Sequence, residues 1–145
     1  MIYFSQEELI IRDMKYEDAQ AITLVAEYAH KPVGYINIYP DSPWGAFGGK
    51  GYPEIVDFGV LEKYRKHGIG AALMNTAEKI ASEYADTVYL GVGLHSGYGS
   101  AQRMYVKRGY IPDGSGVWYN DEICKPHGEC KNDDDLVLYF SKKLR

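Results

Sequence analysis

The sequence predicts a mixed α/β fold whose strands run in both directions, and three observations lead to this class. Residues 54 to 94 have the pattern of a strand, a helix and a second strand, and a connection of this kind makes the two strands parallel. Residues 21 to 39 have the pattern of an antiparallel hairpin, and residues 136 to 140 of a last strand. At 145 residues the chain has the usual size of one domain, so we expect a single domain over residues 1–145.

The first third of the chain supplies the antiparallel part of this fold. The elements expected here are a strand at 8–12, a short helix at 16–19, and the hairpin strands at 21–29 and 33–39. Residues 40 to 53 contain three Pro and four Gly around Trp44 and Phe47, which is loop composition with apolar anchors. We therefore expect a long loop that lies over part of the domain.

The clearest helix of the sequence follows the strand at 55–60. Its expected apolar face is Leu73, Ala77, Ile80 and Tyr84, and its expected polar face is Glu78, Lys79 and Glu83. The elements expected after it are a strand at 87–94, a helix at 100–108 that Gly109 ends, a strand end and turn at 110–114, and the strand at 136–140.

Bulk composition excludes several classes of protein. The net charge of -4 argues against a nucleic-acid binder, which needs many cations to neutralise phosphates. No window reaches the roughly 18 apolar residues of a membrane span, and the start of the chain does not have the pattern of a secretion signal. These features predict a cytoplasmic protein with neither a nucleic-acid nor a membrane partner.

The two cysteines, Cys124 and Cys130, flank His127 in one short stretch. A structural zinc site normally has four ligands in two pairs, and no second pair is present, so we expect a plain loop with reduced thiols and no metal. A disulfide would need an oxidising compartment, which no other feature of the sequence suggests.

A glycine-containing loop joins the strand that ends at Val60 to the helix that follows. Its sequence is Arg65-Lys66-His67-Gly68-Ile69-Gly70-Ala71-Ala72, and it leads directly into a helix N-terminus, where free N–H groups and the helix dipole favour a phosphate. The loop lacks the Gly-Lys-Ser/Thr ending of a Walker A motif, and Leu73 stands where a dinucleotide fingerprint has its third Gly. The phosphate therefore belongs to another kind of ligand.

The pattern Arg65-x-x-Gly68-x-Gly70-Ala71 after a strand resembles the acetyl-CoA motif of the GNAT acetyltransferase superfamily. Residues 100 to 110 are similar to the second cofactor motif of that family, with Ala101, Tyr105, Lys107, Gly109 and Tyr110 in register. The resemblance implies a mostly antiparallel sheet of six to seven strands with one splayed parallel pair, and helices on both faces. It also implies acetyl-CoA as the acyl donor and a homodimer as one assembly state.

The resemblance assigns a cofactor role to a specific set of residues. These are the end of the first strand of the pair, the loop and two positions of the later helix: Phe58, Gly59, Val60, Arg65, Lys66, His67, Gly68, Ile69, Gly70, Ala71, Ala101 and Tyr105. The sequence departs from the family at Tyr98, where Asn is frequent. The segment before the hairpin is also too short for the usual pair of N-terminal helices, which predicts an open acceptor side.

A base is needed for acetyl transfer to an amine, because only roughly one alkyl amine in a few thousand is unprotonated at neutral pH. Glu54 matches the catalytic glutamate of the histone acetyltransferase branch, although it could be a surface strand residue. Asp57 is the second candidate base, or a group that binds a cationic acceptor. Tyr105 is the candidate acid for the leaving thiolate, or a core aromatic residue.

Trp44 and Phe47 either form a wall of the acceptor site or anchor their loop to the core. The favoured function is an N-acetyltransferase that acts by direct transfer to a primary amine of a peptide or small molecule. Two other functions stay open: a non-catalytic acyl-CoA-binding or regulatory module, and a metal-binding interaction protein built on Cys124, His127 and Cys130.

Overall fold

A computed structural model describes residues 1–6, 8–13 and 21–145 of the chain. Its strands are β1 (Ile2–Gln6), β2 (Leu9–Asp13), β3 (Ile22–Tyr28), β4 (Lys31–Tyr39), β5 (Glu54–Val60), β6 (Thr87–Gly93), β7 (Ile111–Tyr119), β8 (Glu122–Ile123) and β9 (Leu136–Lys143). Its α-helices are α1 (Ile69–Ala81) and α2 (Gly99–Lys107), and two short 3-10 helices span Glu62–Tyr64 and Ser96–Tyr98. None of the described helices has the length and apolar character needed to cross a membrane.

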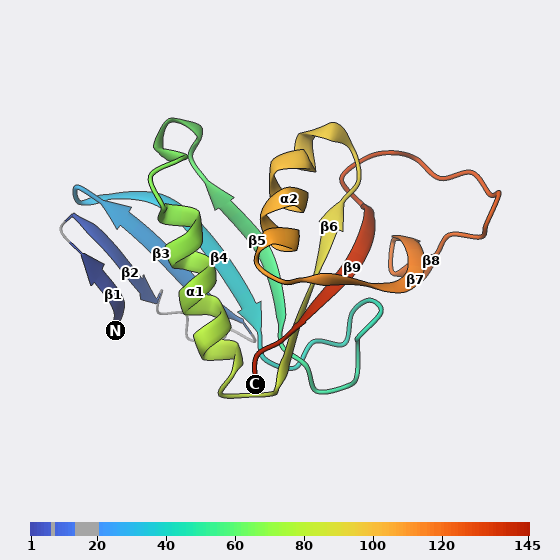
Figure 1. Cartoon of the computed structure of the whole chain (residues 1–145), viewed down its shortest axis with the longest axis horizontal. Coiled ribbons are helices and arrows are strands. Elements are labelled where there is room, and N and C mark those ends of the chain that lie inside the picture. Colours follow the sequence, from blue (N-terminus) through green and yellow to red (C-terminus); the bar gives the residue numbers. More distant parts are fainter. Residues whose placement is uncertain (7, 14–20) are drawn as a thin grey trace.

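All nine strands form one sheet in the order β1-β2-β3-β4-β5-β6-β9-β7-β8, shown in Figure 1. Among the strands of the described residues, only β5 and β6 are parallel, and every other pair of neighbours is antiparallel. The mixed fold with a single parallel pair is therefore confirmed. The sheet is wider than the expected six to seven strands because β1 and β8 extend its two edges.

The two added strands lie where their residues give little periodic signal. Four of the five β1 residues are exposed, so its side chains do not alternate between core and solvent. Strand β8 has two residues, both exposed. The helix expected at 16–19 lies outside the described residues.

Helix α1 begins directly after Gly68, whose φ of 80° is left-handed, and ends at Ala81. Leu73, Ala77 and Ile80 are buried as expected. The expectation for Tyr84 was wrong: it lies beyond the end of the helix and is 51% exposed. The apolar spacing continued past the point where the backbone leaves the helix.

Both described helices contribute to one core against the same set of alternating strand residues. Leu24, Ile36, Val88 and Leu90 from the sheet are buried together with Leu73 and Tyr105 from the helices. The opposite face of β6 carries Tyr89, whose ring packs against Phe47 of the loop at 40–53. A long loop, rather than a helix, covers the sheet at that position.

Glu78 was expected on a solvated face of α1, but its side chain is only 11% exposed. Its carboxylate accepts hydrogen bonds from Arg108 at 3.0 Å, from Lys142 at 2.7 Å and from the Tyr110 hydroxyl at 3.1 Å. These partners come from the end of α2, from β9 and from the turn before β7. Glu78 therefore joins three parts of the fold that are distant in sequence.

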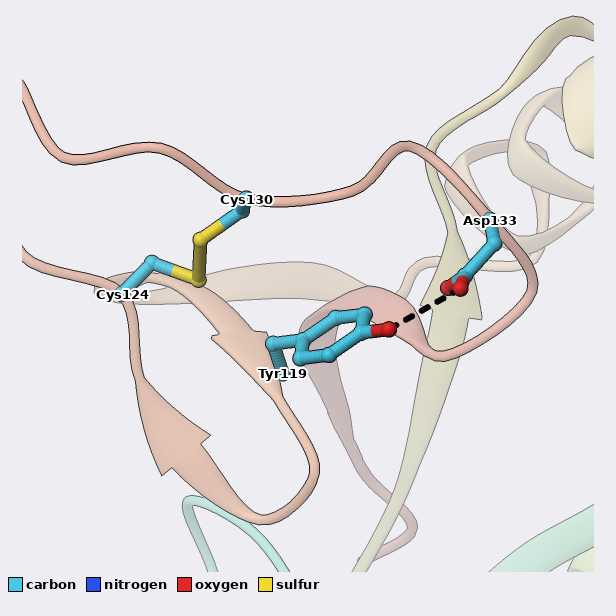
Figure 2. Close-up of a disulfide and its surroundings, with 4 residues drawn as sticks. All are labelled: Tyr119, Cys124, Cys130 and Asp133. Atoms are coloured by element: carbon cyan, nitrogen blue, oxygen red, sulfur yellow. Dashed lines mark hydrogen bonds between the residues drawn. A yellow bond between two sulfur atoms is a disulfide. The ribbon is translucent and has the colours of Figure 1, made fainter.

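Cys124 and Cys130 form a disulfide, shown in Figure 2, so the expectation of reduced thiols was wrong. The tight β7–β8 hairpin turns the chain back, with the Cys124 N–H donating to the Val117 carbonyl at 2.8 Å. Farther along, Asp133 accepts a hydrogen bond from Tyr119 at 2.9 Å and holds the returning segment against the hairpin (Figure 2). Since the two sulfurs are bonded to each other, the proposed metal ligands Cys124 and Cys130 are not available as thiolates. Within the described part of the chain, no group of three His, Cys, Asp or Glu side chains could hold a metal ion.

Candidate active site

The site forms where the parallel strands part. Strands β5 and β6 pair only at Glu54–Tyr89 and Ile55–Leu90, and beyond these residues they separate. On its other side β5 bulges against β4: the register shifts between Tyr35 and Asn37, and Asp57 has a left-handed φ of 53°. A cleft of about 850 Å³ occupies the gap between the two strands.

Most of the predicted cofactor residues meet in this cleft. Those that line it are Phe58, Gly59, Val60, Arg65, Lys66, Gly70, Ala101 and Tyr105, together with the acceptor candidate Asp57. The other predicted cofactor residues, His67, Gly68, Ile69 and Ala71, do not line it. The Ile69 side chain is buried in the core, and the exposed His67 ring lies near that of Tyr28.

The loop at 65–68 opens the N-terminus of α1 toward the cleft. Ala72 is the first residue of the helix whose N–H finds a helical carbonyl, that of Gly68 at 3.0 Å. The N–H groups of Ile69, Gly70 and Ala71 thus have no partner within the helix, which suits an anion. Arg65 already makes two hydrogen bonds within the protein. Its backbone N–H donates to the Glu62 carbonyl, and its side-chain Nε donates to the Val60 carbonyl.

Tyr105 projects from α2 into the inner part of the cleft and is only 7% exposed. Burial raises the pKa of its hydroxyl to about 12, so it carries its proton throughout the physiological range. Its ring meets that of Tyr110 edge to face, with 5.7 Å between the centroids. The residue is therefore both a packed aromatic and a cleft-lining hydroxyl that keeps its proton, so the two expectations for it are compatible.

Glu54 immediately precedes the first β5 residue that lines the cleft, Ile55. Its side chain is 5% exposed and accepts a hydrogen bond from the Ser42 hydroxyl at 2.7 Å. Burial raises the pKa of this carboxyl to about 7; the Ser42 bond lowers it, and the nearby charge of Asp121 raises it further. Glu54 is thus not a solvated strand residue, and it can gain or lose a proton near neutral pH.

Asp57 stands at the bulge, exposed and held by a short chain of hydrogen bonds. Asn37 donates to its Oδ2 at 3.1 Å, and Thr23 donates to Asn37 at 2.6 Å. Within the described ranges no cation forms an ion pair with Asp57. The exposure and the fixed orientation of this carboxylate suit a group that binds a cation.

The loop at 40–53 lies over the outer face of β5 and β6. Phe47 packs on Tyr89 with 5.1 Å between ring centroids, so it anchors the loop. Trp44 is 56% exposed, while its carbonyl accepts a hydrogen bond from the Tyr89 hydroxyl at 2.6 Å. Of these two aromatic residues of the loop, Trp44 is the exposed one.

Sequence reasoning missed several parts of the site. Ser42 had no signal, because a serine in a Pro- and Gly-rich loop is ordinary. Gly91 and Gly93 line the cleft from β6, and their spacing of two along a strand indicated close approach on one face. A Cβ on Gly93 would clash with the Tyr98 ring, so Tyr98 fills the space that this glycine leaves.

Comparisons with known proteins agree with this geometry. Residues 2–110 match the model of the acetyltransferase (GNAT) family. An N-alpha-acetyltransferase of Sulfurisphaera tokodaii is 35% identical over 102 residues, which are 65% of this chain and 59% of that protein.

Solved structures show the same fold. Protein PH1933 of Pyrococcus horikoshii aligns with a TM-score of 0.61 at 26% identity, over 83% of this chain and 64% of that one. Naa50 of Arabidopsis thaliana, in complex with the bisubstrate analogue CoA-Ac-MVNAL, aligns with a TM-score of 0.59 at 23% identity, over 83% and 72%. The family match extends over most of the chain and includes both motifs, and the chain belongs to the acetyltransferase (GNAT) family.

Proposed function

We propose that this protein is an N-acetyltransferase that moves an acetyl group from acetyl-CoA to a primary amine by direct attack. The observation that carries the proposal is the position of Glu54. Glu54 does not line the cleft, but it is buried next to Ile55, which does, at the end where β5 and β6 are still paired, and its carboxyl group has a pKa of about 7. Arg65, Lys66 and Gly70, at the N-terminus of α1, line another part of the same cleft. The first feature suits a general base and the second suits a diphosphate.

The donor side of the cleft fits coenzyme A. The unpartnered N–H groups at the start of α1 and the adjacent Lys66 would hold its pyrophosphate. The gap between β5 and β6, walled by Val60, Ala101 and Tyr105, would admit its pantetheine arm. Acetyl-CoA supplies a thioester that an amine can attack.

The acceptor reaches the site as an ammonium ion with a pKa near 10.4, so a proton must leave before its nitrogen can attack. Glu54, ionised above a pH of about 7, takes this proton directly or through one water. The nitrogen attacks the thioester carbonyl to form a C–N bond, and when the tetrahedral intermediate collapses the C–S bond breaks and the Tyr105 hydroxyl donates its proton to the departing thiolate. The second proton on the attached nitrogen leaves to solvent, and Tyr105 regains a proton from solvent. No covalent acyl-enzyme is needed.

Asp57 is the proposed acceptor-binding group, and Trp44, exposed on the loop at 40–53, is the proposed wall of the acceptor site. The carboxylate is exposed, lines the cleft and is fixed by Asn37, so it can pair with a cationic acceptor. Replacing it in Asp57→Asn should raise KM for a diamine several-fold more than KM for a monoamine. Equal effects on the two acceptors, measured by initial rates, would contradict this role.

The decisive experiment follows free thiol release from acetyl-CoA in the presence of a panel of amines and short peptides. The panel includes peptides with free N-termini because the Sulfurisphaera tokodaii relative is an N-alpha-acetyltransferase. We expect acceptor-dependent release by the wild type. Glu54→Gln should bind acetyl-CoA with unchanged affinity and turn over at least about 100-fold more slowly.

A non-catalytic acyl-CoA-binding module is the alternative, and the same assay separates the two functions. Tight binding of acetyl-CoA with no thiol release across the panel would support the module. The buried, high-pKa position of Glu54 favours the enzyme, since a binding module does not need an ionisable group there.

A further inference from the structure

We infer that Ser42 is a positioning residue that fixes the orientation and the proton occupancy of Glu54. The inference rests on the proposed function, in which Glu54 is the base. It comes from the contact between two side chains that are both buried, at 0% and 5% exposure. Ser42 itself does not line the cleft.

The Ser42 hydroxyl is held between Glu54 and the backbone of Trp44. Its Oγ donates to Glu54 Oε1 at 2.7 Å and accepts from the Trp44 N–H at 3.3 Å. A hydroxyl has one proton, so the bond it accepts from Trp44 leaves that proton for the carboxylate. Glu54 is therefore held by a donor that is itself fixed by the backbone of its loop.

The position of Ser42 does not depend on its bond to Glu54. Its own N–H donates to the Tyr52 carbonyl at 3.4 Å, and its carbonyl accepts from the Gly49 N–H at 3.1 Å. The loop is tied down again where the Gly45 N–H donates to Asp121 at 2.7 Å. A variant without the Ser42 hydroxyl should keep the loop in place.

The charged and titratable groups around Glu54 make the Ser42 donor important. Asp121, from the β7–β8 turn, and Asp57, from β5, both oppose its ionisation, while the Tyr89 hydroxyl from β6 favours it. Tyr139 faces it from β9. Among the described residues no cation forms an ion pair with Glu54. Burial disfavours the ionised form of Glu54, and among the neighbouring groups the Ser42 hydroxyl does most to stabilise that form.

The test compares Ser42→Ala, Ser42→Thr and, as a matched control, Ser5→Ala on the exposed edge strand β1. The titration of the Glu54 carboxyl is followed by ¹³C NMR, with its signal assigned by loss in Glu54→Gln, and kcat is measured against pH. In Ser42→Ala we expect both the titration and the acid limb of the kcat profile to move up by about one pH unit. Activity should then fall several-fold near pH 6.5 and recover at alkaline pH, while Ser42→Thr and Ser5→Ala keep the wild-type profile.

A loss of activity at every pH with an unmoved Glu54 titration would overturn the inference, because it would leave Ser42 with a merely structural role. A titration that moves while the kcat profile stays fixed would support Ser42 as the group that controls Glu54. That second outcome would instead remove Glu54 as the base in the proposed function, so the two failures are distinguishable.

Discussion

The elevated pKa of Glu54 makes a prediction about stability that needs no substrate. The carboxyl titrates near 4.5 in the unfolded chain and at about 7 in the folded protein, so below 4.5 both states hold the proton. Between these values the folded state alone keeps it, and raising the pH therefore destabilises the fold. Each pH unit of that interval corresponds to 1.36 kcal/mol, which gives a loss of about 3 kcal/mol by pH 8.

Glu54→Gln removes the titration but keeps an amide oxygen that can accept the Ser42 hydrogen bond. The difference in free energy of unfolding between Glu54→Gln and the wild type should therefore grow by about 3 kcal/mol in favour of the variant from pH 4 to pH 8. Urea unfolding of both proteins at several pH values measures it, with the exposed Glu122→Gln as control. A constant difference across this range would refute the raised pKa and, with it, the argument for Glu54 as a base tuned to neutral pH.

Three further predictions follow from other parts of the site and fold. In Gly70→Asp the new Cβ would lie 3.3 Å from Phe58 and the carboxylate would face the free N–H groups of α1, so acetyl-CoA affinity measured by calorimetry should fall at least about 100-fold. The exposed Asn75→Asp on the same helix adds the same charge and should bind normally. In Tyr105→Phe we expect kcat to drop about tenfold with little change in cofactor affinity, since a thiolate can leave without full protonation; unchanged initial rates would exclude Tyr105 as the acid. Glu78→Gln should lower the free energy of unfolding by about 2 kcal/mol, because three donors lose a charged acceptor, and a value near zero in urea titrations would contradict the bridging role of Glu78.

Local patterns were enough to predict the part of the fold that carries the site. The strand, helix and strand at 54–94 have strong periodic signals, and Gly109, with a φ of 96°, ends the second helix as its sequence indicated. The pairing of β5 with β6 followed from the connection alone. The predicted bounds of an element were wrong where tertiary contacts decide them. Tyr84 continues the apolar spacing of the helix, but it lies after the helix has ended.

Contacts between distant segments could not be predicted. Glu78 looked like a solvated residue, because its partners Arg108, Tyr110 and Lys142 meet it only in the folded chain. Cys124 and Cys130 looked like free thiols, because no feature of the sequence indicated an oxidising compartment and the turn between them, where the Gly128 N–H donates to the Lys125 carbonyl, was not expected. For Glu54 the role was proposed from sequence, but its burial beneath the loop that carries Ser42 depends on tertiary packing.

The separation of β5 and β6 affects the rigidity of the sheet. Strands β1 to β5 form one half of the sheet and strands β6 to β9 form the other. Within the described chain, the two halves are joined by pairing between β5 and β6 at Glu54 and Ile55 alone. An acyl-donor molecule bound between β5 and β6 would connect the two halves of the sheet where these strands do not pair. Binding of the donor should then make both halves of the sheet more rigid, and amide hydrogen exchange should slow in the strands on both sides of the gap between β5 and β6.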